Sequence, residues 1–89
     1  MNGQFTKDPS STLDYTIDWS GWLGTDEIID TTWTVPSGLK NVKNTNTTTT
    51  ATIWLSGGDP GITYSIECEI STDQGRIDSR QLTIFITNK

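Results

Sequence analysis

The alternation of apolar and polar residues is most regular in the last third of the chain, between residues 61 and 88. From residue 62 to residue 70 every second side chain is apolar, and the positions between them hold Thr, Ser and Glu. A period of two is typical of a β-strand, because alternate side chains point to opposite faces. Residues 72–75 have turn chemistry, and alternation resumes at residues 82–87. The pattern predicts a long antiparallel hairpin whose apolar face another sheet must cover.

Four earlier segments also fit strands and are separated by turn residues: residues 13–19, 28–35, 39–46 and 51–56. The segment of residues 39–46 is poor in apolar residues, so we expect a short or irregular strand there. Within residues 28–35, Ile29, Thr31, Trp33 and Val35 share a face, and we expect Trp33 to be the central tryptophan of the core. Trp22 falls between two glycines, and Trp54 falls on the polar side of its strand. Both indoles are therefore expected to be at least partly exposed.

Six or seven short strands, turns rich in Gly, Pro, Asn and Asp, and no helical pattern predict an all-β fold. The expected architecture is a small antiparallel immunoglobulin-like β-sandwich formed by residues 13–89. With 89 residues the chain forms one domain with one modest core. The single cysteine, Cys68, cannot form an internal disulfide, and we expect it to be a small buried hydrophobe. The other expected core residues are Tyr15, Ile17, Trp33, Ile53, Leu55, Tyr64, Ile66, Leu82 and Ile84.

Residues 1–12 show no periodicity and are interpreted as an extended N-terminal arm outside the sandwich. Fully extended, such a segment reaches about 35 to 40 Å, beyond the body of a small domain. Phe5 and the pair Asp8 and Pro9 would be unusual in a purely solvated tail. We therefore expect the arm to dock on a partner or on the chain's own sheet.

Charge and hydropathy exclude several classes of function. The net charge of −5 comes without a basic cluster, which excludes binding to a nucleic-acid backbone. No run approaches the about 20 apolar residues of a membrane span, and the first ten residues lack the features of a secretory signal. We expect a soluble, unprocessed protein made in a cytoplasm.

The sequence also lacks the residues of common catalytic and cofactor sites. There is no histidine, one cysteine, and no glycine-rich phosphate loop, so neither an enzyme nor a cofactor or zinc site is expected. Asp26, Glu27 and Asp30 could offer oxygen ligands to Ca²⁺. Their spacing is not that of an EF-hand, and we expect these acids to be solvated turn residues.

Large aromatic side chains outside the expected core remain to be explained. Exposed aromatics are enriched at protein interfaces, since they bury much area at little cost in conformational entropy. The candidate partner-binding residues, from the arm and from these aromatics, are Phe5, Lys7, Asp8, Pro9, Trp22 and Trp54.

Several short blocks give the chain a family resemblance. They are Lys7-Asp8-Pro9, Leu13-Asp14-Tyr15, Ile17-Asp18-Trp19, Trp22-Leu23, and the segments 32–36, 51–58, 75–76 and 78–80. In these blocks the sequence resembles small immunoglobulin-like structural proteins of tailed bacteriophages. The resemblance implies a virion component without catalytic residues, attached at the head, the neck or the fibre base.

Two hypotheses on function follow. The first is a virion structural protein, either a neck or tail-fibre adaptor or a capsid decoration subunit. It would dock on other capsid, neck or tail proteins in symmetric copies through its arm and exposed aromatics. The alternative is a carbohydrate-binding or host-adhesion module that stacks sugar rings on Trp22 or Trp54.

Overall fold

The computed structural model describes the backbone of residues 3–87 and the side chains of residues 5–87. The outermost parts of the predicted arm and of the last predicted run, residues 1–2 and 88–89, lie outside the described residues. The described chain forms seven strands and one helical turn: β1 (Gly3–Lys7), β2 (Thr12–Asp18), α1 (Ser20–Leu23), β3 (Ile28–Thr34), β4 (Leu39–Asn46), β5 (Thr50–Gly57), β6 (Thr63–Thr72) and β7 (Ile77–Ile86).

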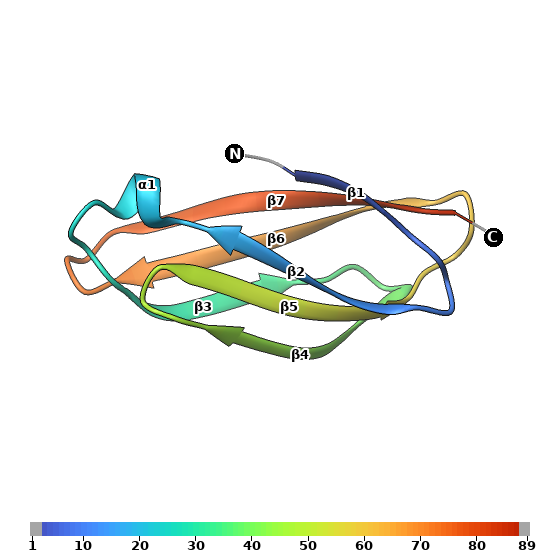
Figure 1. Ribbon diagram of the computed structural model, residues 1–89, viewed down its shortest axis with the longest axis horizontal. Helices are drawn as coiled ribbons and strands as arrows, with labels where there is room; N and C mark the ends of the chain where they lie inside the picture. Colours follow the sequence, from blue (N-terminus) through green and yellow to red (C-terminus); the bar gives the residue numbers. More distant parts are fainter. Residues whose placement is uncertain (1–2, 88–89) are drawn as a thin grey trace.

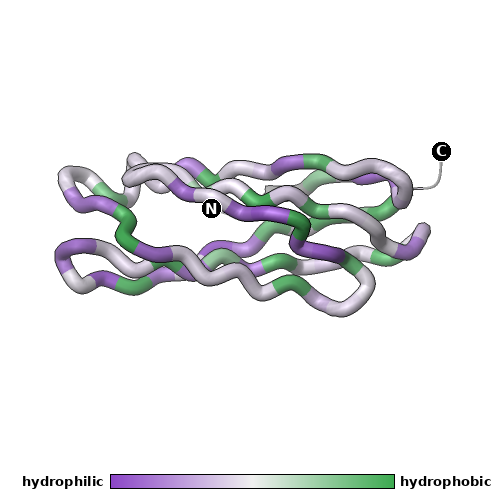
Figure 2. The backbone as a smooth tube through the Cα atoms, turned by 90° about the horizontal axis from the view of Figure 1, so that it is seen from below, coloured by the Kyte–Doolittle hydropathy of each residue, from purple (hydrophilic) through white to green (hydrophobic). Residues whose placement is uncertain are grey.

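The strands form two sheets that pack face to face (Figure 1). The four-stranded sheet has the order β1-β7-β6-β3, and the three-stranded sheet has the order β2-β5-β4. Every pair is antiparallel except β1 with β7. Hydrophobic and hydrophilic residues recur in short bands along the strands (Figure 2). The predicted all-β sandwich of about seven strands is confirmed.

The predicted C-terminal hairpin is the longest pairing in the sandwich. β6 and β7 pair without a register shift from Thr63 opposite Phe85 to Ser71 opposite Ile77. At the turn, Gly75 has φ +84°, a conformation that side chains rarely adopt, so a glycine is required there. The apolar side of both strands is buried, as the alternation indicated.

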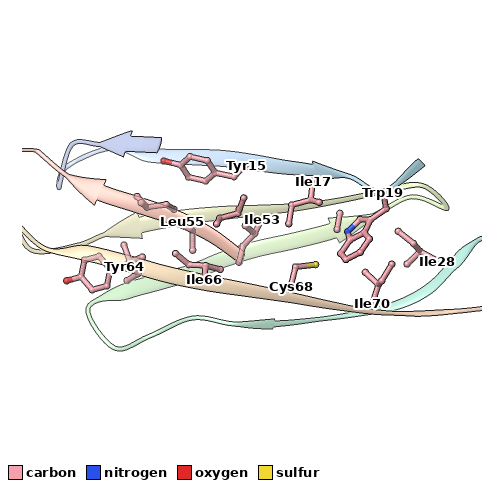
Figure 3. Packing of buried hydrophobic residues seen from close by; sticks show 14 of the residues in the cluster. Tyr15, Ile17, Trp19, Ile28, Ile53, Leu55, Tyr64, Ile66, Cys68 and Ile70 are labelled. Carbon is pink, nitrogen blue, oxygen red and sulfur yellow. The ribbon is translucent and has the colours of Figure 1, made fainter. Parts of the chain in front are cut away.

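The core lies between the two sheets, and Figure 3 shows its central part. All the expected core residues are buried except Trp33, which is only partly buried and packs against the core from β3. The central tryptophan is instead Trp19, which has no exposed surface. The main-chain N–H of Trp19 donates to Thr49 O at 2.9 Å just after β2, and the indole enters the space between the sheets (Figure 3). The prediction for Trp33 was therefore wrong.

Local irregularities account for three further differences from the sequence prediction. A register shift between Ile28 and Asp30 turns Ile28 inward and leaves Ile29 63% exposed, although alternation had placed Ile29 inside. β4 is a full eight-residue strand, and its expected irregularity is a register shift between Asn41 and Lys43. The loop expected after β2 contains the helical turn α1. No helix within residues 3–87 is long and apolar enough to cross a membrane.

The N-terminal segment adds an edge strand to the four-stranded sheet. β1 runs parallel to β7, with Gly3 opposite Leu82 and Lys7 opposite Ile86. Of the two dockings expected for the arm, on a partner or on the chain's own sheet, this structure has the second. The division of the chain into an arm of residues 1–12 and a sandwich of residues 13–89 stays a prediction.

Candidate functional site

An open groove runs along one side of the sandwich, between the edge of β7 and strand β2. Its volume is about 590 Å³, and the residues that define it are Phe5, Ile17, Asp18, Trp22, Arg80 and Leu82. We call it the side groove. Within residues 3–87, β1 pairs with β7 from Leu82 onward, and no described strand covers the preceding part of β7 on that side. Two of the aromatics selected from the sequence, Phe5 and Trp22, therefore meet at one site.

Trp22 is held in place from behind by a neighbouring cation. The Arg76 guanidinium lies 4.2 Å from the centre of the Trp22 ring, and its Nη2 donates to Leu23 O at 2.9 Å. The Arg76 Nε also pairs with Asp26 Oδ2 at 3.0 Å. Trp19 also meets Trp22 edge-on, with ring centres 5.5 Å apart. These contacts fix a half-buried indole in the wall of the groove.

Asp26 is the anchor of this arrangement and not the solvated turn acid that we expected from the sequence. Its side chain is buried, and Oδ1 accepts hydrogen bonds from the Glu27 N–H at 2.8 Å and the Gln74 N–H at 3.1 Å. Burial opposes ionisation, but hydrogen bonds from Thr72, Glu27, Arg76 and Gln74 outweigh it and lower the pKa of Asp26 to about 2. The carboxylate therefore stays charged and ties the start of β3 to the β6–β7 turn.

No metal site emerges around these acids. Within residues 3–87 no group of three or more His, Cys, Asp or Glu side chains is placed to hold a metal ion.

Arg80 and Asp18 give the groove a polar rim. The Arg80 guanidinium lies 4.1 Å from the centre of the buried Trp19 ring, and its Nη1 donates to Asp18 O at 3.2 Å. Asp18 Oδ1 accepts a hydrogen bond from the Ser20 N–H at 2.9 Å, and hydrogen bonds from Ser20 lower the pKa of Asp18. Both charges are thus held in place beside an apolar base formed by Ile17 and Leu82. Such a site suits an apolar side chain flanked by polar main chain.

Phe5 closes one end of the side groove. It lies opposite Ile84 in the parallel pair, so its side chain points toward the space between the sheets. There its ring centre is 4.9 Å from that of Tyr15, with an angle of 59° between the rings. Because β1 is an edge strand, 39% of Phe5 remains exposed.

The other arm residues selected from the sequence lie away from the groove and stabilise the turn between β1 and β2. Lys7 is only 2% exposed, and its Nζ donates to Asp8 O at 2.9 Å and to Gly57 O at 2.8 Å. Burial lowers the pKa of Lys7, although the nearby Asp8 carboxylate opposes this shift. Asp8 Oδ1 accepts hydrogen bonds from Ser10, and Pro9 is half-buried. Lys7 is therefore an internal link between β1 and β5, which corrects its selection as a surface contact.

Trp54, the remaining candidate, lies on the outer face of the three-stranded sheet. Its neighbours across the strands are Asp14 on β2 and Lys43 on β4. The Lys43 ammonium lies 4.8 Å from the centre of the half-buried ring. The structure does not bring Trp54 together with the side groove.

Sequence reasoning missed Arg76 and Arg80, although one signal for Arg80 was present. Arg80 precedes Leu82 by two residues, so it occupies a position of β7 whose side chain points inward. A charged residue at an inward position of a strand indicates an open edge where the charge can reach water. No comparable pattern marks Arg76, which lies in a turn.

Solved structures with similar folds cover nearly the whole chain. The solution structure of the PKD domain from KIAA 1837 protein, an immunoglobulin-like domain, matches 99% of this chain and 81% of its own with a TM-score of 0.57 and 16% identity. The crystal structure of a 2,6-sialyltransferase from Vibrionaceae Photobacterium sp. JT-ISH-224 matches 99% of this chain with a TM-score of 0.65 and 10% identity. The chain spans only 18% of the length of that enzyme. At such low identities these likenesses show the fold alone.

Sequence comparison gives the more specific result. No curated protein matches the chain. A family model described as podophage GP4 fiber-tail adaptor protein gp77 matches residues 7–85. Since this match covers most of the sequence, the chain belongs to the family of the podophage GP4 fiber-tail adaptor protein gp77.

Proposed function

We propose that this chain is a non-catalytic structural protein of a phage particle and joins fibre proteins to the tail. The observation that carries the proposal is the family match over residues 7–85, since the family is described as a fiber-tail adaptor. Of the locations that the sequence left open, the family favours the tail over a capsid decoration. The partners are other virion tail proteins, and the function requires shape and contact surface but no reacting group.

The side groove supports docking through Phe5 and Trp22. Its wall is rigid, because Arg76 and Trp19 hold the indole, and its base is apolar. Rigid aromatic side chains in a concave site are typical anchors of protein interfaces. A groove of this kind gives the N-terminal segment and the exposed aromatics a shared role in partner binding.

The small size of the domain makes several copies favourable. A standard interface buries about 800 Å² on each partner, roughly a sixth of the 5108 Å² accessible surface of this chain. An adaptor must make two such contacts, one on each partner, and each is of modest area. Repetition around a symmetric tail would multiply such contacts through effective concentration. We therefore propose that the chain is present in multiple symmetric copies.

The contacts of Trp22 and Trp54 favour this role over the alternative of sugar stacking. A sugar ring stacks on a free aromatic face. The Arg76 guanidinium lies over Trp22 at 4.2 Å, and the Lys43 ammonium lies over Trp54 at 4.8 Å. Each indole is also half-buried, so a large part of its surface is already occupied.

Particle incorporation of groove variants tests the proposal. Deleting residues 1–11 would also remove β1, so point variants are the sharper probe. Phe5→Ala and Trp22→Ala should each lower the amount of this chain and of fibre protein in purified particles, because truncation of a hot-spot residue at an interface costs about 2 kcal/mol or more.

Val42→Ala is the matched control, because Val42 is 50% exposed on β4, away from the groove. Thermal unfolding of each purified variant separates loss of docking from loss of folding. Folded Phe5→Ala and Trp22→Ala proteins that enter particles at the wild-type level would contradict docking through the groove.

A further inference from the structure

The edge of β7 next to the side groove presents main-chain groups that no strand within residues 3–87 pairs with, although the Ser79 N–H donates to the side-chain Oδ1 of Asp78 at 2.9 Å. The Ile86 N–H donates to Ile62 O at 3.0 Å, and Ile86 O accepts from the Gly61 N–H at 2.9 Å, so both groups point toward β6. The next residue, Thr87, donates its N–H to Lys7 O at 2.8 Å on the opposite side. Since successive residues of a strand alternate, the N–H and C=O groups of the odd-numbered residues 77, 79 and 81 point away from β6. Within residues 3–87 no strand pairs with them.

This edge has only one of the features that usually prevent strand pairing, the inward-pointing charge of Arg80. Proteins protect exposed edges with bulges, prolines, lysines and inward-pointing charges. The edge strands β3 and β4 both have register shifts, and β4 also carries Lys40 and Lys43. Residues 77–81 of β7 contain no Lys or Pro, and their register with β6 is regular. Ile77 at its start is 68% exposed.

The same edge borders the side groove, and β1 shows how a strand sits beside it. Arg80 and Leu82 line the groove, and β1 pairs with β7 from Leu82 onward. In β1 the alternate side chains of Phe5 and Lys7 turn inward between the sheets. A strand added in line with β1 would likewise direct alternate side chains into the groove.

We propose that β7 residues 77–81 and the side groove together accept an extended segment of another virion protein as an added strand, with a bulky apolar side chain inserted between Phe5 and Trp22. The inference rests on the proposed function and specifies how the partner binds. Main-chain pairing supplies part of the affinity, and the groove selects the apolar side chain.

The geometry of the free edge favours a peptide over a second folded copy. β1 occupies the edge of β7 from Leu82 onward, and α1 lies near the other end of β7 (Figure 1). The free stretch of five residues, 77–81, is about 17 Å long at the usual rise of a strand. An extended peptide fits between these two elements, whereas the edge of a folded sheet would meet them.

Synthetic peptides provide a direct test. Overlapping 15-residue peptides that cover the fibre and tail proteins of the same phage are labelled, and their binding to the full chain is measured by fluorescence anisotropy. We expect at least one peptide to bind. Ser79→Pro removes an outward N–H without removing a hydrogen bond to β6, and Trp22→Ala removes one wall of the groove. Each should weaken binding tenfold or more, whereas Trp54→Ala, on another face, should change it less than twofold.

Hydrogen exchange of the wild-type complex gives a readout that does not depend on how well the variants fold. The bound peptide should slow exchange of the Gln81 amide and of the Ser79 amide, which in the free chain donates only to the side chain of Asp78. The inference is overturned if no peptide binds, if protection appears elsewhere, or if Ser79→Pro binds as wild type. It is also overturned if the chain pairs with itself through residues 77–81, seen as a concentration-dependent dimer that Ser79→Pro abolishes.

The proposed function and the further inference can fail separately. If particles incorporate Ser79→Pro normally, strand addition is wrong and the adaptor role stands. If the wild-type chain is absent from purified particles, the adaptor role itself is wrong.

Discussion

Replacing Lys7 by Met distinguishes the structural role of this residue from the surface role that the sequence suggested. Met keeps an unbranched apolar stem of similar length and removes only the ammonium. The lost contacts are hydrogen bonds to Asp8 O at 2.9 Å and to Gly57 O at 2.8 Å, which join β1 to the end of β5. A surface contact to a partner would leave the stability of the free chain unchanged, whereas an internal link would not.

The expected loss of stability for Lys7→Met follows from two opposing contributions. Each hydrogen bond from a charged donor contributes about 1.5 to 3 kcal/mol, but removing the ammonium also removes the cost of burying it. We expect a net loss of about 1 to 3 kcal/mol in the free energy of unfolding. For a domain of this size each kcal/mol lowers Tm by about 4 to 8 °C.

Chemical and thermal unfolding measure this loss, and hydrogen exchange in β1 should rise more than in β6. Lys43→Met is the matched control, because the Lys43 ammonium lies over Trp54 on the outer face and such a contact contributes about 0.5 to 1 kcal/mol. If Lys7→Met unfolds like the wild-type protein while Lys43→Met is the more damaging change, the assignment of Lys7 as an internal link is refuted.

Three further predictions follow from the core and from the carboxylate cluster. Trp19→Ala should lower the free energy of unfolding by about 3 to 5 kcal/mol, and Trp54→Ala by about 1 to 2 kcal/mol, as measured by denaturant unfolding; equal losses would contradict the placement of the two indoles. The pKa of Asp26 is lowered to about 2 from 3.8, so its contribution is complete above about pH 4 and is lost as the pH falls toward 2. Thermal unfolding across this range should show a steeper loss of stability for the wild-type protein than for Asp26→Asn. Parallel profiles would contradict the lowered pKa of Asp26. Burial raises the pKa of Cys68 to about 12, so a thiol reagent at neutral pH should react only after unfolding, and rapid reaction of the native protein would contradict its burial.

Hydrophobic patterning predicted the strands well because most of them follow strict alternation. The β6–β7 hairpin and the buried sides of β2 and β5 have the residues that the period of two assigned. Errors arose where one residue disturbs the period. The register shift after Ile28 reverses the faces of Ile28 and Ile29, and nothing in the run of residues 28–35 marks its position.

The choice of core tryptophan depended on how the two sheets pack, which local patterns do not contain. Trp33 and Trp19 both continue an apolar alternation, and β3 and β2 are both edge strands, but only Trp19 is fully buried between the sheets. Strand order is set by long-range pairing, such as that of β1 with β7 across most of the chain. For this reason the sequence could suggest that the N-terminal segment docks but not where.

The candidate site was predictable in part. Exposed aromatics identified Phe5 and Trp22, which the fold brings to one groove. Lys7 was misassigned because a lysine near a terminus is usually solvated, and only the fold reveals the carbonyl oxygens that surround its ammonium. The edge of β7 at residues 77–81 is likewise a property of the pairing, since it depends on the part of β7 that lies opposite β1 within residues 3–87.

Electron cryomicroscopy of the purified phage particle tests the central claim most directly. We predict this chain in several copies between tail and fibre proteins, with density from a neighbouring protein in the side groove against Phe5 and Trp22. Particles that lack the chain, or that contain it with the groove open to solvent and its contacts elsewhere, would contradict the account.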